Sequence, residues 1–173
     1  MSGYCESNRF ERIRRQGVRG DQKGFSLLEL MVTVSVIMII SAIAIPNLMR
    51  GKINANEAVA LSSMRALNQA CSAYWMEHYA YPASLADLDP GSASAPASLD
   101  LAGPELVSGY KSGYTFSYKV TSVDSSGRPQ SYAIVADPVS RGYTGERGFY
   151  ADDSGPIRVN PTGMATSASP PAD

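Results

Sequence analysis

Residues 24–46 read GFSLLELMVTVSVIMIISAIAIP, and this stretch decides the fold. The run from Phe25 to Ile45 has 21 residues and a single charge, Glu29. As a helix it would be about 31 Å long, which is enough to cross the hydrocarbon core of a bilayer. A secretory signal peptide has a shorter apolar stretch that is followed by its cleavage site. Here the small residue, Gly24, precedes the apolar run, so cleavage there would leave the run on the mature protein.

Charge is distributed unevenly about Gly24. Residues 1–24 carry six basic and three acidic side chains, whereas residues 25–173 carry nine basic and thirteen acidic ones. A short basic terminus stays on the cytoplasmic side of a membrane. We therefore expect residues 1–24 to be a leader peptide, residues 25–46 to be a transmembrane helix, and the rest of the chain to lie across the membrane.

Glu29 is the one charged side chain within the apolar run, one helical turn from its start. A carboxylate at the centre of a membrane helix costs about 2.5–3.5 kcal/mol on insertion scales, and less near the edge. Acids inside a membrane usually have a partner, which favours a specific role for Glu29. The alternative is a side chain that reaches the membrane surface without a partner.

The residues Lys23–Leu30, KGFSLLEL, resemble the processing site of the type IV pilins and of the pseudopilins of type II secretion systems. The resemblance implies that a prepilin peptidase cuts after Gly24 and N-methylates Phe25, the new first residue. It also implies that Glu29 forms an assembly salt bridge with the Phe25 amine of the next subunit, and that Pro46 kinks the helix. The match is specific because the basic leader, the Gly-Phe pair, the glutamate, the apolar run and the proline occur together.

Beyond Pro46 the sequence predicts that the helix continues to about Ala80 as an amphipathic helix, because residues 47–80 contain no proline. Side chains at alternating intervals of three and four residues predict one buried stripe along it. The stripe consists of Ala60, Met64, Leu67, Cys71, Tyr74 and His78.

The remainder of the chain is predicted to form a small antiparallel sheet. Residues 82–110, with four prolines, are predicted to be a loop. Alternation of apolar and polar residues and short turns then predict a meander of four strands. These are Tyr114–Thr121, Ser131–Ala136, Arg147–Ala151 and Ile157–Val159.

The expected fold class is therefore α+β, type IV pilin-like: a long N-terminal helix whose amphipathic half packs on a small antiparallel sheet. Residues 47–159 form the predicted globular domain. Residues 160–173 are mostly proline, alanine, serine and threonine, and are predicted to be disordered.

No catalytic signature occurs in the sequence, neither a nucleophile elbow nor a phosphate loop, a metalloprotease motif or a dinucleotide fingerprint. The prediction is that the chain is not an enzyme and has no cofactor. Asp152 and Asp153 are weak candidates for calcium ligands, since major pseudopilins hold calcium in their C-terminal loop and the ion prefers oxygen donors. The pair is explained more simply by turn chemistry, so no metal is predicted.

The resemblance implies a structural subunit of a type IV pilus-like filament. The precursor would lie in the bacterial inner membrane, and the mature subunit in a periplasmic or extracellular filament. Implied partners are copies of itself, other pilins, the prepilin peptidase and an inner-membrane assembly platform. Two alternatives stay open: a type II secretion pseudopilin, and a minor pilin-like binding module anchored in the membrane. Nucleic acid is not expected as the main ligand, because the mature chain carries a net negative charge.

Overall fold

The computed structural model describes residues 24–89, 91–92 and 104–172. The chain divides into two compact units between Ser41 and Ala42, and each is described by itself. Helix α1, Leu27–His78, supplies the elements of the first unit and continues into the second. The helical assignment runs through Pro46 without a break, so the predicted continuous helix is confirmed.

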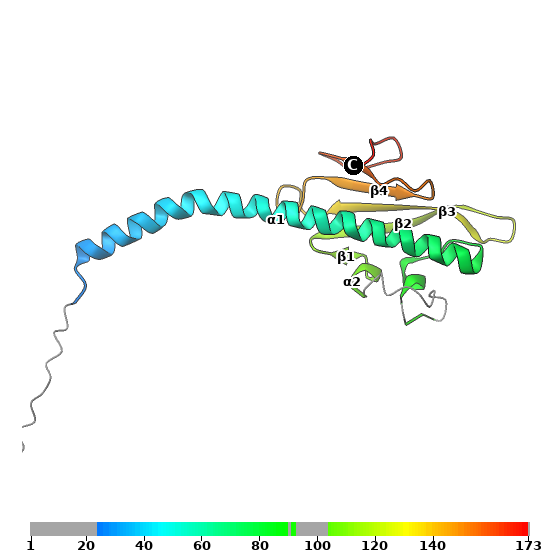
Figure 1. Ribbon diagram of the computed structural model, residues 1–173, viewed down its shortest axis with the longest axis horizontal. Coiled ribbons are helices and arrows are strands. Elements are labelled where there is room, and N and C mark those ends of the chain that lie inside the picture. Colours follow the sequence, from blue (N-terminus) through cyan, green and yellow to red (C-terminus); the bar gives the residue numbers. More distant parts are fainter. Residues whose placement is uncertain (1–23, 90, 93–103, 173) are drawn as a thin grey trace, which may run out of the picture. The chain divides into compact units, whose positions relative to one another are not determined.

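The second unit contains one antiparallel sheet of five strands in the order β1-β2-β3-β4-β5 (Figure 1). Each strand pairs with its neighbour in sequence, so the predicted meander is confirmed. β2 and β3 extend beyond their predicted ends, and β1 was not predicted because a strand of two residues shows no alternation. The strands are β1 (Tyr110–Lys111), β2 (Tyr114–Val123), β3 (Pro129–Pro138), β4 (Gly148–Asp152) and β5 (Arg158–Asn160).

The core lies between the second half of α1 and one face of the sheet (Figure 1). Four residues of the predicted stripe, Ala60, Met64, Leu67 and Cys71, are fully buried. They belong to one apolar cluster with Tyr114, Phe116, Ile134 and Phe149 of the sheet. Tyr74 is half-buried, whereas His78, the last residue of α1, is exposed.

Residues 82–110 are not simply the loop that we predicted. They contain the 3₁₀ helix η1 (Leu85–Leu88) and the short helix α2 (Pro104–Val107). Asp87 accepts a hydrogen bond from the backbone amide of Ser84 at 2.9 Å, which caps η1. Leu85, Leu88 and Leu106 are buried in the core. Helices of four residues are too short to show a 3.6-residue period, and so the sequence pattern did not reveal them.

The prediction that residues 160–173 are disordered is wrong for residues 160–172, which the structure places beside β5. The amide of Val159 donates to the carbonyl of Pro170 at 2.8 Å, and the amide of Ala172 donates to the carbonyl of Ile157 at 2.7 Å. Ala165 is only 3 % exposed. The prediction rested on the small number of apolar side chains in this segment. Backbone hydrogen bonds mainly hold the segment in place, and composition does not reveal them.

Candidate functional site

The predicted cleavage site lies immediately before α1. Gly24, Phe25 and Ser26 precede the helix, and the amide of Leu30 donates to the carbonyl of Ser26 at 3.1 Å. Phe25 is 83 % exposed, and apart from Gly24 itself and its two chain neighbours no described atom lies within 4 Å of where a Cβ on Gly24 would be. The described part of the chain therefore leaves the Gly24–Phe25 bond open to another protein. The predicted leader, residues 1–23, lies outside the described residues.

Glu29 occupies the first turn of α1 and is exposed. An acidic side chain here is favoured by the positive end of the helix dipole. Among the described residues its carboxylate has no hydrogen-bond or ion-pair partner. The carboxylate is thus available to a partner from outside the chain, while its predicted role with Phe25 stays a prediction.

The first unit is apolar on every side of its helix. Its aliphatic side chains are all substantially exposed, including Leu27, Leu28, Met31, Ile37, Met38, Ile39 and Ile40. Such a helix requires lipid or other apolar helices around it. The hydroxyls of Thr33 and Ser35 donate to the carbonyls of Leu30 at 2.9 Å and Met31 at 2.7 Å, so neither needs water. By length and composition α1 can cross a membrane.

Pro46 lies inside α1, between the apolar run and the half that packs on the sheet. Its ring nitrogen has no hydrogen, so one backbone hydrogen bond of the helix is missing at this place. The kink predicted at Pro46 stays a prediction.

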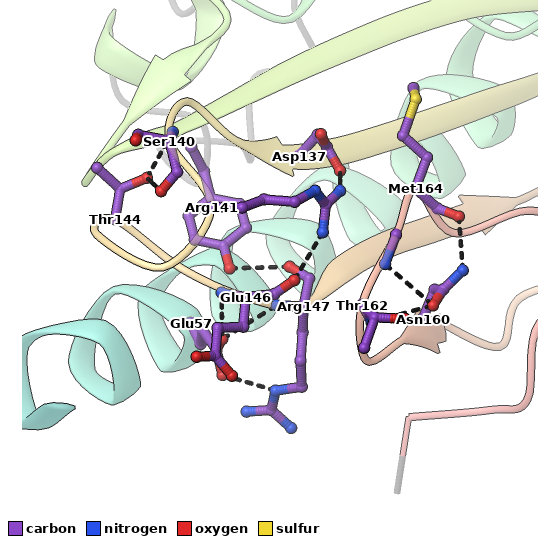
Figure 2. A network of polar contacts seen from close by, with 12 residues as sticks. Glu57, Asp137, Ser140, Arg141, Thr144, Glu146, Arg147, Asn160, Thr162 and Met164 are labelled. Carbon is purple, nitrogen blue, oxygen red and sulfur yellow. Dashed lines mark hydrogen bonds and ion pairs between the residues drawn. The ribbon is translucent and has the colours of Figure 1, made fainter.

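Glu57 anchors the loop between β3 and β4, and the sequence analysis did not identify it. Its side chain is only 5 % exposed. One carboxylate oxygen, Oε1, accepts hydrogen bonds from the amides of Glu146 at 2.9 Å and Arg147 at 3.1 Å. The other, Oε2, accepts one from Nε of Arg147 at 2.6 Å (Figure 2). Glu57 lies three residues before Ala60, the first residue of the predicted stripe. The available signal was therefore a carboxylate in line with that stripe, one helical turn before it.

The environment of Glu57 favours its charged form. Burial raises the pKa of the carboxyl group, but the two amide hydrogen bonds and the Arg147 guanidinium outweigh that effect. The pKa is therefore held below its ordinary value of 4.5. The charged carboxylate is the form that ties the loop to α1.

Further contacts hold the same loop rigidly. Arg141 pairs with the carboxylate of Asp137 and donates to the carbonyl of Glu146 at 2.6 Å (Figure 2). The hydroxyl of Tyr114 donates to the carbonyl of Arg147 at 2.9 Å. A Cβ on Gly145 would lie 2.1 Å from that hydroxyl oxygen, so only glycine fits there. The loop is thus fastened to α1, β2 and β3 together.

Asp152 and Asp153, the weak calcium candidates, both have partners within the chain. Oδ1 of Asp152 accepts a hydrogen bond from the amide of Ser154 at 3.0 Å. Oδ2 of Asp153 accepts one from the hydroxyl of Ser131 at 3.3 Å. Among the described residues, no group of three or more histidine, cysteine, aspartate or glutamate side chains converges on one point. The contacts of Asp152 are those of an aspartate that shapes a turn.

Comparison with known proteins gives a family motif and a set of relatives. The family described as the prokaryotic N-terminal methylation motif matches residues 19–45. Type II secretion system core protein G of Escherichia coli is 38 % identical over 61 residues, which are 35 % of this chain and 42 % of that protein. The protein of the same name from Aeromonas hydrophila is 37 % identical over 68 residues, 39 % of this chain and 48 % of that protein.

A longer match extends beyond the N-terminal helix. Type II secretion system core protein G of Pseudomonas aeruginosa is 28 % identical over 141 residues, which are 79 % of this chain and 94 % of that protein. The chain spans less than half the length of the Escherichia coli and Aeromonas hydrophila relatives. No solved structure matches the chain significantly.

Three observations point in the same direction. The methylation motif matches residues 19–45, the matches to the relatives extend over 61 to 141 residues, and the second unit has a helix packed on an antiparallel meander. The N-terminal motif and the α+β, pilin-like fold are those expected of the type IV pilin and type II secretion pseudopilin family, with which the relatives agree.

Proposed function

We propose that this chain is a pseudopilin of a type II secretion system, a structural subunit that polymerises through α1 after removal of its leader. The observation that carries the proposal is that the matched relatives are type II secretion system core protein G. The sequence alone favoured a pilus subunit and kept the pseudopilin as an alternative. The relatives favour the alternative.

The proposed order of insertion, cleavage and assembly follows from the apolar character of the first half of α1. The apolar helix first inserts in the inner membrane, where lipid covers its exposed side chains. Cleavage after Gly24 then creates an amine on Phe25, which methylation leaves basic. In a filament the apolar helices of neighbouring subunits replace the lipid. The second unit supports the proposal because its core, and the loop tied to Glu57, are complete without the apolar half of α1.

The partners in this proposal are other pseudopilins, the prepilin peptidase and the assembly platform of the inner membrane. The second unit has a structural role in this proposal, and not a catalytic one. The filament is proposed to lie in the periplasm, with its apolar helices in the interior.

The proposal is tested by deleting the gene in the source bacterium and measuring two phenotypes in parallel. We expect the secreted enzymes of the type II system to accumulate in the periplasm, while surface pili and twitching motility are retained. Expression of the wild-type chain from a plasmid should restore secretion. Loss of surface pili with normal secretion would instead identify a pilus subunit.

A further inference from the structure

The segment that follows β5 turns back on the sheet. Asn160, the last residue of β5, organises the first turn with its side chain (Figure 2). Its Oδ1 accepts hydrogen bonds from the amides of Thr162 and Gly163, both at 3.1 Å, and its Nδ2 donates to the carbonyl of Met164 at 3.0 Å. The chain therefore leaves β5 in a fixed direction. We call residues 161–172 the C-terminal strap.

A second turn brings the strap back beside β5. The amide of Ser169 donates to the carbonyl of Thr166 at 3.0 Å, and the hydroxyl of Ser169 accepts a hydrogen bond from the amide of Thr166 at 3.1 Å. Between the two turns, Ala165 is buried. The strap is thus held by hydrogen bonds at both turns, and it has one buried apolar residue, Ala165, between them.

The strap covers the free edge of the sheet. β5 is the last strand in the sheet order and pairs with β4 on one side only. On its other side Val159 donates to Pro170, Ala172 donates to Ile157, and Arg158 lies opposite Pro171 in an antiparallel bridge. Two of the backbone groups through which β5 would pair with another chain, the amide of Val159 and the carbonyl of Ile157, are therefore occupied by the strap.

Pro171 closes the outer side of the strap. In an antiparallel pair of this kind, Pro170 and Ala172 direct their bonding groups toward β5, so Pro171 directs its backbone groups away from the sheet. Its ring nitrogen has no hydrogen to donate. A further strand that approached the strap would find no amide donor at this position, and prolines of this kind are confined to sheet edges.

The strap lies close against the second unit at two further places. A Cβ on Gly148, the first residue of β4, would lie 2.5 Å from the carbonyl oxygen of Gly163 and 3.1 Å from the amide nitrogen of Ala165. Nη1 of Arg158 donates to the carbonyl of Ser169 at 3.1 Å. The strap therefore has contacts with β4 as well as with β5.

We propose that the C-terminal strap seals the β5 edge against strand pairing with a second copy of this chain, and that Pro171 is the residue that blocks pairing on its outer side. An exposed edge is a template for pairing between identical chains, and a membrane or a filament would hold many copies close together. The strap would then restrict self-association to the apolar helix. The inference does not depend on which filament the chain forms.

Hydrogen exchange of the full chain in detergent micelles tests this proposal at single amides. In the wild-type chain the Val159 amide should be protected at every protein concentration. Deleting residues 161–173 should make this amide exchange rapidly in dilute samples and become protected as concentration rises, because a second copy replaces the strap. Sedimentation should show association over the same range, beyond that of the wild type.

A substitution provides a second, independent test of the proposal. P171V adds one outward amide donor to each copy, and so two hydrogen bonds to a symmetric pair, which should tighten association about tenfold. P161V is the matched control, because Pro161 lies on the same strap and, among the described contacts, forms no backbone hydrogen bond or bridge with β5.

Two outcomes would overturn the proposal. One is a truncated chain that melts cooperatively yet leaves Val159 unprotected at all concentrations and associates no more than the wild type. The other is a P171V chain that associates no more strongly than P161V. If the truncated chain does not fold, the comparison of P171V with P161V decides alone. Neither outcome bears on secretion, so the proposed function is tested separately.

Discussion

Replacing Glu29 by leucine is expected to reduce the filament yield sharply while leaving leader cleavage and membrane insertion intact. Glu29 is an exposed carboxylate without a partner among the described residues, near the start of a helix that is apolar on every side. Cleavage after Gly24 would place a basic amine on Phe25, one turn away. Opposite charges attract far more strongly in a medium of low dielectric than in water, and each is costly to leave unpaired there.

The family resemblance implies that the pair forms between subunits, so that assembly removes the cost of both charges. The cost of about 2.5–3.5 kcal/mol for a central carboxylate is an upper bound for Glu29, which lies near the edge, so pairing is worth at most roughly a hundredfold in an association constant. The yield of sheared or purified filament from a Glu29→Leu strain that lacks the wild-type gene should fall accordingly. The processed subunit should accumulate in the inner membrane.

Glu77→Leu is the matched control for this experiment. Glu77 is an exposed acid on the same helix, in the half that packs on the sheet. This control should assemble as the wild type does. Normal filaments from the Glu29→Leu strain would show that the carboxylate is not the assembly device.

Replacing Glu57 by glutamine is expected to produce the largest loss of stability of the second unit. The buried carboxylate accepts three hydrogen bonds from Glu146 and Arg147, and glutamine has only one carbonyl oxygen to accept them. If that oxygen keeps the two amide hydrogen bonds, the NH2 group of glutamine faces Nε of Arg147, donor against donor. Loss of this charged hydrogen bond should cost about 2–3 kcal/mol at neutral pH. Urea unfolding of the detergent-solubilised chain, followed by the fluorescence of Trp75, measures the difference.

The pH dependence of this loss identifies the charged carboxylate as its source. The pKa of Glu57 is lowered on folding. Its contribution to the free energy of unfolding is therefore fully present above pH 4.5, and it is lost as the pH falls through the folded-state pKa. The wild type and Glu57→Gln should therefore converge in stability in acid. Glu146→Gln is the control, since only the backbone of Glu146 enters the network. A difference from the wild type that stayed constant down to strongly acidic pH would argue for a packing defect instead.

The periodicity of the sequence predicted those helices and strands that are long enough to contain several periods of the side-chain pattern. Ala60, Met64, Leu67 and Cys71 recur at helical spacing, and all four are buried against a sheet that alternates as expected. A long helix and strands of ten residues, such as β2 and β3, contain several periods. Their positions could therefore be read from side-chain pattern alone.

The features that were missed depend on single contacts between distant residues. Glu57 meets Arg147 across 90 positions of the chain, and no local pattern pairs them. The strap likewise rests on main-chain bonds, such as Val159 to Pro170, that any side chain could allow. The cleavage site is predicted from its motif, and the structure contributes the exposure of Phe25 and Glu29 rather than their roles.

The central claim is that the chain is cut after Gly24 and keeps its apolar helix. Intact-mass analysis of the chain from membranes or filaments tests this most directly. The predicted mature species begins at methylated Phe25 and has 149 residues, the 173 of the precursor less the 24 of the leader. In a strain without prepilin peptidase the unmethylated precursor should accumulate instead. A mature species that retains residues 1–24, or one that has lost residues 25–45, would contradict the account.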